Sequence, residues 1–441
     1  MIAIRLQQIL IRLPTASTAR WRSLLGQGGV ILMGYIAIAL LGMGALRLYT
    51  ELAPKAVFGE SNLLLTALTL GTQIFVAPFT NTQLRYHTAA QAAGKAGAFT
   101  REALVWALRG AAALAVLAVI GCLVSGRLGA TALGPAAALP AFAWVFAFTV
   151  RNVLMSRLQA EQRRITYTGM MVVEMLAQAV FTVAALRVAP TIAAFVLGQV
   201  LAAMTLIGLI LWIAVRSSPQ REAGDVGPTG FRTHVASYGM AFAPLAVVGW
   251  LSNLADRYTL GLLLGSAAVG EYVAPLSIAS RMMTMASGAL NDLFRPLLFD
   301  AENHRRHSHA NRLFGVWVAA SAVTGAAAVL AIALAGKVAV GLLLGHGYRE
   351  HAVPIMAWAA SGYAVYGLTQ IFETRMLSLG KSSWLVATMA AGAIANVAFS
   401  VVLISVHGVI GAAQANCLSF VVQAVITALF LVAALRRRAR A

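Results

Sequence analysis

Long apolar segments recur along the whole chain, and short polar stretches separate them. Each segment holds about 20 mostly apolar residues, the length that an α-helix needs to cross a bilayer. The loops between the segments leave no room for a folded domain outside the membrane. The pattern therefore predicts an all-α polytopic membrane protein with twelve spans, at 28–48, 62–80, 103–124, 136–155, 168–186, 191–215, 235–255, 266–290, 313–336, 353–372, 383–406 and 409–435.

The segment 216–234 divides the chain into two halves. It is the stretch between spans that is densest in Pro, Gly and charged residues. Six spans fall in 28–215 and six in 235–435, and an even count gives both halves the same orientation. Parallel repeats of this kind occur in transporters, with the substrate path between them. We therefore expect two six-helix lobes around a central cavity.

Lys and Arg residues predict the orientation of the chain. Of the 33 Lys and Arg residues, 23 lie on the side of the N-terminus, 7 lie on the opposite side and 3 lie within spans. Cytoplasmic loops carry such an excess. We expect both termini in the cytoplasm, where 1–27 would include an interfacial helix with Ile2, Leu6, Ile9 and Leu13 on one face, and 436–441 would form a basic tail.

The composition excludes several classes of protein. Hydrophobic residues make up 60% of the chain and charged residues 11%. The net charge of +19 does not indicate nucleic-acid binding, because no soluble basic domain carries it. Cys122 and Cys417 both lie within apolar spans, so we expect neither a disulfide framework nor a metal site. The histidines of the loop 302–309 stand beside Arg305 and Arg306, which oppose a metal cation there. We expect no cofactor.

Five charged side chains fall in or at the end of spans, in the half of the membrane that faces the cytoplasm. A cation within a span is costly and usually faces a polar cavity or a partner. Arginine guanidinium groups also match phosphate oxygens with two hydrogen bonds. The charges therefore predict a basic cavity for an anionic group such as a diphosphate, lined by Arg281, Arg109, Arg151 and Arg85, with Glu174 as an ion-pair or coupling residue.

Each of these charges also has a structural interpretation. Arg85 and Arg151 lie near enough to a span end for their side chains to reach the interface. Glu174 is also explained as a structural partner of Arg109 or Arg151. Arg281 lies about nine residues from the end of its span, too deep to reach the interface, and favours a functional role.

Three charges on the opposite side are candidates for a gate. Asp256 and Arg257 end one predicted span, and Glu271 follows the start of the next. They are expected either to form a periplasmic gate between the lobes or to be ordinary interfacial charges. No Walker loop, nucleophile elbow or zinc motif occurs in the sequence, so we expect no enzymatic activity.

The stretch around Asp256 also resembles a known family. Asp256-Arg257, Leu264-Gly265 and Val269-Gly270-Glu271-Tyr272 are similar to the region between spans 7 and 8 in Wzx-type polysaccharide flippases of the MOP superfamily. Similar stretches are Pro54…Phe58-Gly59, Gln83-Leu-Arg85-Tyr86 and Leu342-Leu-Leu-Gly-His-Gly-Tyr348. With its twelve spans in two lobes, the chain is similar to the family over nearly its full length.

The resemblance implies a fold, a function and a location. It implies a MATE-like arrangement of two lobes and the movement of an undecaprenyl-diphosphate-linked oligosaccharide repeat unit from the cytoplasmic to the periplasmic leaflet. Such a protein would sit in a bacterial inner membrane and serve O-antigen, capsule or exopolysaccharide synthesis. Its expected partners are the lipid-linked oligosaccharide and membrane lipids, and a polysaccharide polymerase and other assembly proteins are candidates. Nucleic acid is not expected.

Three other classes of protein are compared with this sequence by the features that each would show. A MATE-like ion-coupled antiporter of small, often cationic, molecules would place carboxylates within the first lobe, where the predicted spans hold only Glu174. A peptidoglycan-precursor flippase of the same superfamily usually has further spans at its C-terminus. A membrane enzyme of glycan assembly would show a sizeable polar loop. The first two remain open.

Overall fold

The computed structural model describes residues 18–127, 135–216, 230–380 and 382–440, and within these ranges it contains helices and no strands. The interfacial helix expected near the N-terminus and most of the linker 216–234 lie outside them. The described elements are α2 (Thr18–Leu52), α3 (Lys55–Phe75), α4 (Ala77–Ala92), α5 (Ala96–Arg127), α6 (Pro135–Ala160), α7 (Arg164–Val188), α8 (Ile192–Arg216), α9 (Phe231–Ser237), η1 (Gly239–Ala241), α10 (Phe242–Leu264), α11 (Ser266–Asn303), α12 (His307–Leu343), η2 (His346–Tyr348), α13 (Ala352–Ser378) and α14 (Ser382–Arg440).

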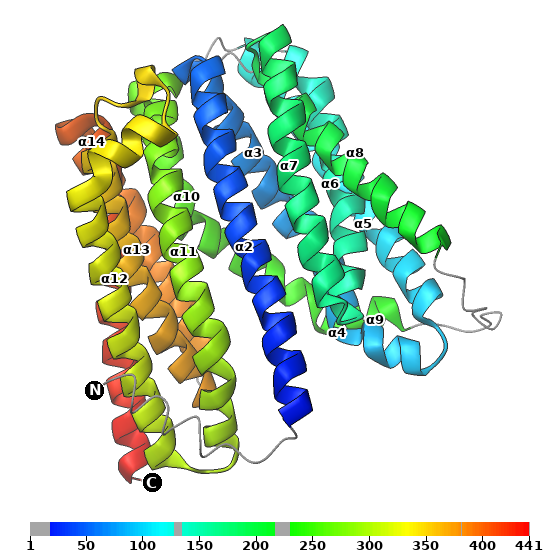
Figure 1. Cartoon of the computed structure of the whole chain (residues 1–441), viewed down its shortest axis with the longest axis vertical. Coiled ribbons are helices and arrows are strands. Elements are labelled where there is room, and N and C mark those ends of the chain that lie inside the picture. The colour runs from blue at the N-terminus through cyan, green and yellow to red at the C-terminus, as the bar shows by residue number, and fades with distance from the viewer. Residues whose placement is uncertain (1–17, 128–134, 217–229, 381, 441) are drawn as a thin grey trace.

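The helices form two lobes that stand side by side (Figure 1). In the first lobe α2 packs on α7, α7 on α8, α8 on α6, α6 on α5 and α5 on α4. In the second lobe α14 packs on α10 and α13, and α13 packs on α11 and α12. The lobes meet where α3 lies against α10 and α11. The predicted architecture of two helical lobes is confirmed.

The observed helices account for all twelve predicted spans. Seven described helices are long and apolar enough to cross a membrane, and the bent pair α3 and α4 would add an eighth. Helix α14 covers two predicted spans, because its backbone breaks at Gly408 (φ 60°). The remaining three predicted spans correspond to α10, α11 and α13. The chain is a multi-pass membrane protein.

Several predicted boundaries differ from the structure, among them the span predicted at 235–255, which the structure divides between α9 and α10. The span predicted at 62–80 is two helices bent by 53°, because Pro78, near the start of α4, cannot donate the hydrogen bond that would continue α3. The segment 18–27, predicted to precede the first span, belongs to α2. The basic tail predicted at 436–441 continues α14 as far as Arg440.

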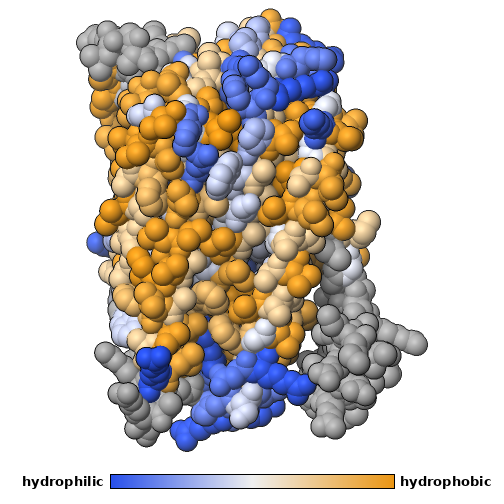
Figure 2. All heavy atoms as spheres, turned by 90° about the vertical axis from the view of Figure 1, so that its left-hand side faces the viewer, coloured by the Kyte–Doolittle hydropathy of each residue, from blue (hydrophilic) through white to orange (hydrophobic). Residues whose placement is uncertain are grey.

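The surface agrees with a membrane location. In the view that faces the side of the second lobe, an apolar band separates polar residues at the two ends of the molecule (Figure 2). On α12, Leu334 is 79% exposed. A large apolar side chain with that exposure is stable in lipid and costly in water.

We name the ends of the molecule by the turns that lie there, the α2–α3 end and the α4–α5 end.

Buried polar groups hold α4 against α5 and α6. Ser156 donates a hydrogen bond to Gln83 (2.8 Å), and Gln83 is within 3.4 Å of Thr100. His87 is buried, and its Nε2 lies 3.8 Å from Glu161 Oε1 in the turn after α6. The nearby His87, together with the hydrogen bond from Arg157 (2.6 Å), lowers the pKa of Glu161 to about 2. The motif Gln83 to Tyr86 noted in the sequence thus includes a structural anchor.

A second buried network lies at the α4–α5 end of the second lobe. Arg375 of α13 is 1% exposed. Its guanidinium donates to Glu302 of α11 and to Asn311 of α12 (2.6 Å). The sequence placed Arg375 among the loop cations, because it directly follows the predicted span 353–372. The structure shows instead that it joins three helices.

We expect Arg375→Leu to unfold the second lobe more readily. The change removes the guanidinium that pairs with buried Glu302, and breaking a buried ion pair costs about 3–5 kcal/mol. Thermal unfolding of the detergent-purified protein should show a much lower midpoint for Arg375→Leu than for Arg306→Ala. Arg306 is the control because its ion pair with Asp300 is more than half exposed. An equal effect of both substitutions would show that the Arg375 network is not a structural anchor.

Candidate functional site

The lobes touch backbone to backbone near the α2–α3 end. A Cβ atom added to Gly59 of α3 would lie 2.0 Å from the carbonyl oxygen of Ser266 on α11. One added to Gly270 of α11 would lie 2.1 Å from the carbonyl oxygen of Lys55. Such distances are far below van der Waals contact. These glycines therefore permit α3 and α11 to pack closely across the lobe interface.

The turn between α12 and α13 adds further contacts across the lobe interface. The Gly345 amide donates to the Thr50 hydroxyl (2.9 Å), and the Tyr348 hydroxyl donates to the carbonyl of Ala53 (2.9 Å). The Tyr348 ring also meets Phe58 edge to face, with centroids 5.9 Å apart. These side chains are buried. The second lobe therefore covers the turn between α2 and α3.

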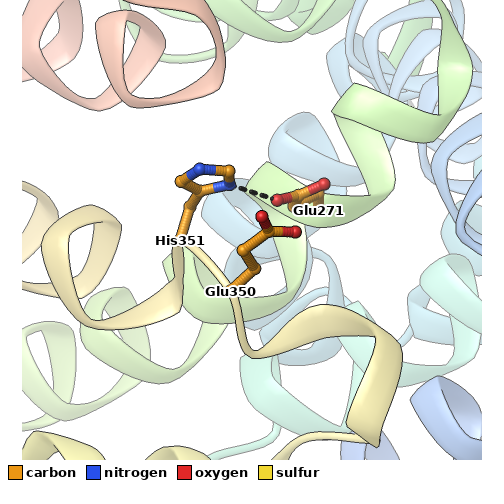
Figure 3. A group of neighbouring side chains, drawn as sticks. All are labelled: Glu271, Glu350 and His351. Atoms are coloured by element: carbon orange, nitrogen blue, oxygen red, sulfur yellow. Dashed lines mark hydrogen bonds and ion pairs between the residues drawn. The ribbon is translucent and has the colours of Figure 1, made fainter.

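Glu271 lies at this interface and joins the lobes through its ion pair with Lys55. Figure 3 shows Glu271 beside Glu350 and His351 of the same lobe. Lys55 of α3 donates to Glu271 (2.8 Å), and the Glu271 carboxylate also lies 2.6 Å from His351 Nδ1. Ligand atoms of Glu271, Glu350 and His351 lie within 4.8 Å of one another, close enough for a metal ion. Both oxygens of Glu271 are, however, already engaged by Lys55 and His351. The group is best described as an ion-pair cluster between the lobes.

Asp256 is not at the interface, which corrects part of the predicted gate. Helix α10 does not end at Asp256 and Arg257 but continues to Leu264. Asp256 is 0% exposed, accepts a hydrogen bond from Tyr272 and lies 3.4 Å from the amide nitrogen of Asn416. These buried partners allow the carboxylate to stay inside the second lobe. Arg257 is half-buried beside it.

The Arg281 side chain extends from the second lobe toward the first lobe. It lies on α11 and is half-buried. A Cβ atom on Gly42 of α2 would lie 1.8 Å from Arg281 Nη1 and 3.1 Å from the sulfur of Met175 on α7. Gly42 therefore leaves the space that the guanidinium fills. Among the residues that the structure describes, the ion pairs involve other arginines and none includes Arg281.

Arg151 and Glu174 form a pair within the first lobe. The Arg151 guanidinium of α6 donates to the Glu174 carboxylate of α7 and to Asn152 (2.7 Å). Glu174 is buried at 6% exposure. The sequence had offered Arg109 or Arg151 as its partner. Met175, the next residue on α7, lies beside Gly42 at the Arg281 contact.

The structure places Arg109 and Arg85 over aromatic rings, so the predicted set of four does not gather at the Gly42–Arg281 contact. Arg109 is exposed on α5, which packs against α3, α4, α6 and α9, and its guanidinium lies over the Trp106 ring (4.6 Å). The Arg85 guanidinium lies over the Tyr238 ring (4.2 Å), which follows α9. The depth of both residues in the membrane stays a prediction, and the direction that each helix faces was not available from the sequence.

A polar pocket of about 230 Å³ opens between α11 and α13, close to Arg281 along α11. The pocket was not recognised in the sequence, because its residues are small or uncharged and come from two predicted spans. The sequence feature that could have indicated the pocket is the face of the span 266–290 that carries small residues and residues with hydroxyl groups. The lining residues are Met283, Thr284, Ser287, Gly288, Asn291, Tyr363, Tyr366, Gly367 and Gln370.

Comparison with known proteins gives a family and a fold. Residues 98–354 match the family described as "Polysaccharide biosynthesis protein". No curated protein matches the sequence. The structure is similar to the lipid II flippase MurJ in an inward closed conformation, with a TM-score of 0.68 and 11% identity over 90% of this chain and 86% of that chain.

Two transporters of another family have the same fold. An inward-facing multidrug resistance MATE family transporter of the MOP superfamily has a TM-score of 0.68 and 12% identity, over 90% of this chain and 95% of that chain. A mutant of the Vibrio cholerae MATE transporter VcmN has a TM-score of 0.65 and 13% identity, over 94% and 97%. At these identities the likeness concerns the fold. The fold and the family match together confirm the resemblance drawn from the sequence.

Proposed function

Because the chain belongs to the polysaccharide biosynthesis protein family and has the fold of MOP superfamily transporters, we propose that it is a flippase for a lipid-linked oligosaccharide. Its substrate would be an undecaprenyl-diphosphate-linked repeat unit of a surface polysaccharide. The protein would move this unit from the cytoplasmic to the periplasmic leaflet of a bacterial inner membrane. Transport here requires no catalytic group.

The position of Arg281 carries this proposal. Its guanidinium reaches the lobe interface beside Gly42, and no described carboxylate neutralises it. A cation inside a membrane protein normally has a partner or faces a polar path. A diphosphate would supply that partner, and a guanidinium can bind its oxygens with two hydrogen bonds. Arg151 is less available, because Glu174 already accepts a hydrogen bond from it.

Alternating access fits the distribution of contacts between the lobes. The contacts between the lobes described above lie in one part of the interface, which extends from the Gly42–Arg281 contact to the α2–α3 end. The described ends of the chain and the Arg-rich loops lie at the α4–α5 end (Figure 1). By the distribution of Lys and Arg, we place the α4–α5 end in the cytoplasm. The conformation described here would then be closed toward the periplasm, with Glu271 and Lys55 in the gate.

One observation favours a second candidate function. Glu60 of α3 is 4% exposed, and one of its carboxylate oxygens has no hydrogen-bond partner among the described residues. Glu60 was not among the candidate residues, because the second span is predicted at 62–80 and therefore begins after it. A buried carboxylate in the first lobe is what an ion-coupled antiporter of small molecules would need. A MATE-like antiporter is therefore the alternative.

Deletion of the gene separates the two functions. If the protein is the flippase, cells that depend on it for surface glycan should lose that glycan and accumulate the undecaprenyl-diphosphate-linked repeat unit. The untransported lipid is measured by mass spectrometry of extracted lipids, and a plasmid copy of the gene should reverse both effects. Normal surface glycan, together with a higher sensitivity to cationic drugs, would instead support the antiporter.

A further inference from the structure

The pocket between α11 and α13 has a lining suited to a group rich in hydroxyls. Asn291, Gln370, Ser287 and Thr284 supply amide and hydroxyl groups that can both donate and accept hydrogen bonds. Among the nine lining residues none is charged. Asn291 Nδ2 donates to Gln370 Oε1 at 3.3 Å, a long bond that a ligand could replace.

Two aromatic rings complete the pocket. Tyr363 and Tyr366 stand on α13 and lie against Phe420 of α14, with ring centroids 5.6 and 4.6 Å away. Phe420 is buried and holds both rings from behind. A rigid tyrosine offers an apolar face together with a polar hydroxyl. That combination suits a sugar ring, whose C–H groups form an apolar face between hydroxyls.

We propose that this pocket binds an uncharged sugar of the transported lipid, next to the diphosphate held by Arg281. The proposal rests on the proposed function and adds a binding site to it. The pocket is smaller than the roughly 300–1,000 Å³ typical of sites for drug-sized ligands, so it suits one sugar ring. A negatively charged sugar is disfavoured, because the pocket supplies no cation of its own.

The spacing of residues along α11 places the proposed sugar pocket next to the proposed diphosphate site at Arg281. Arg281, Thr284, Gly288 and Asn291 follow one another at spacings of three and four residues, so they share one face of the helix. At about 1.5 Å per residue, Thr284 lies about 4.5 Å along the axis from Arg281 and Asn291 about 15 Å. The first sugar of such a lipid is bonded directly to the diphosphate, so it falls within this distance.

A substitution at Gly288 can fill the pocket without disturbing the backbone, and so tests whether the pocket binds the sugar. A Cβ atom on Gly288 would meet nothing within 4 Å, so Gly288→Leu places its side chain in the pocket space. Gly315→Leu is the matched control, because Gly315 lies on α12, is exposed and also has free space around a Cβ atom. Asn291→Ala tests the polar lining by a second route.

The experiment compares two lipid probes on the purified full-length protein. One probe is undecaprenyl diphosphate, and the other is the sugar-bearing lipid extracted from cells that lack the gene. The unaltered protein should bind the sugar-bearing lipid about ten times more tightly. Gly288→Leu and Asn291→Ala should remove that difference and leave the affinity for undecaprenyl diphosphate unchanged. Gly315→Leu should behave as the unaltered protein, and Arg281→Ala should weaken binding of both probes.

Two results would overturn the inference, and they have different meanings. If Gly288→Leu keeps the full preference for the sugar-bearing lipid, or weakens both probes equally, the pocket is not the sugar site although the proposed function stands. If the unaltered protein binds neither probe, the proposed function itself fails and the sugar site fails with it.

Discussion

Arg281→Ala should abolish export of surface glycan while the protein remains in the membrane at its normal level. Each hydrogen bond to a charged group contributes about 1.5–3 kcal/mol, so losing the guanidinium should weaken diphosphate binding by about 10–100-fold or more. Removing Arg281 leaves no buried carboxylate unpaired among the described residues, so folding should be largely preserved. The measurement is surface glycan in a complemented deletion strain, with membrane levels determined by immunoblot.

Two further substitutions make this result specific. Arg281→Lys keeps the charge but loses the two-pronged geometry, so we expect partial activity. Arg109→Ala removes a cation that lies over Trp106 on α5, away from the lobe interface, and should leave export close to normal. Full export by Arg281→Ala would rule out the anionic site at Arg281, and the family match would then be the sole support for the substrate.

Gly270→Val should stop transport by preventing the lobes from closing at the α2–α3 end. A Cβ atom at this position would lie 2.1 Å from the carbonyl oxygen of Lys55 and 3.2 Å from the amide nitrogen of Gly59. Backbone atoms cannot move aside as the end of a side chain can, so the lobes must separate there. The variant should therefore favour the conformation that is open toward the periplasm.

The change in conformation can be measured directly. A single cysteine in place of Phe58, which is 3% exposed, should react with a membrane-impermeant maleimide in Gly270→Val cells and not in cells with Gly270. The native Cys122 and Cys417 are replaced by alanine in both cases. Gly44→Val is the control, because a Cβ atom there would meet nothing within 4 Å. Normal transport by Gly270→Val would contradict a gate at this contact.

The fold was largely predictable from the sequence because membrane spans are recognised locally. A run of about 20 apolar residues is stable in lipid whatever its neighbours are. The twelve predicted spans therefore reappear as helices, and the two halves as lobes. The predicted end of a span was wrong where a helix continues through charged residues. Helix α10, for example, continues past Asp256 to Leu264. There the hydrogen-bond donors that permit burial, Tyr272 and Asn416, lie 16 and 160 positions away.

The candidate site was predictable only in part. The depth of Arg281 in its span indicated a special role, which stays a prediction, and the structure places Arg281 on α11 at the lobe interface. The same reasoning selected Arg109 and Arg85, which face Trp106 and Tyr238 instead. In lipid both the outer face and the packed face of a helix are apolar, so the pattern of hydrophobic residues does not show which way a charge points.

The sequence by itself determined that this protein is a helical membrane protein of two halves with a marked excess of cations on one side. These properties depend on contiguous hydrophobicity and on the count of Lys and Arg, which a single chain displays directly. Tertiary structure decided that Arg281 remains without a carboxylate partner while Arg151 is paired, and that Glu271 rather than Asp256 joins the lobes. It also placed tyrosines of α13 opposite the polar face of α11. Those outcomes depend on which helix faces meet, and packing between segments distant in sequence decides that.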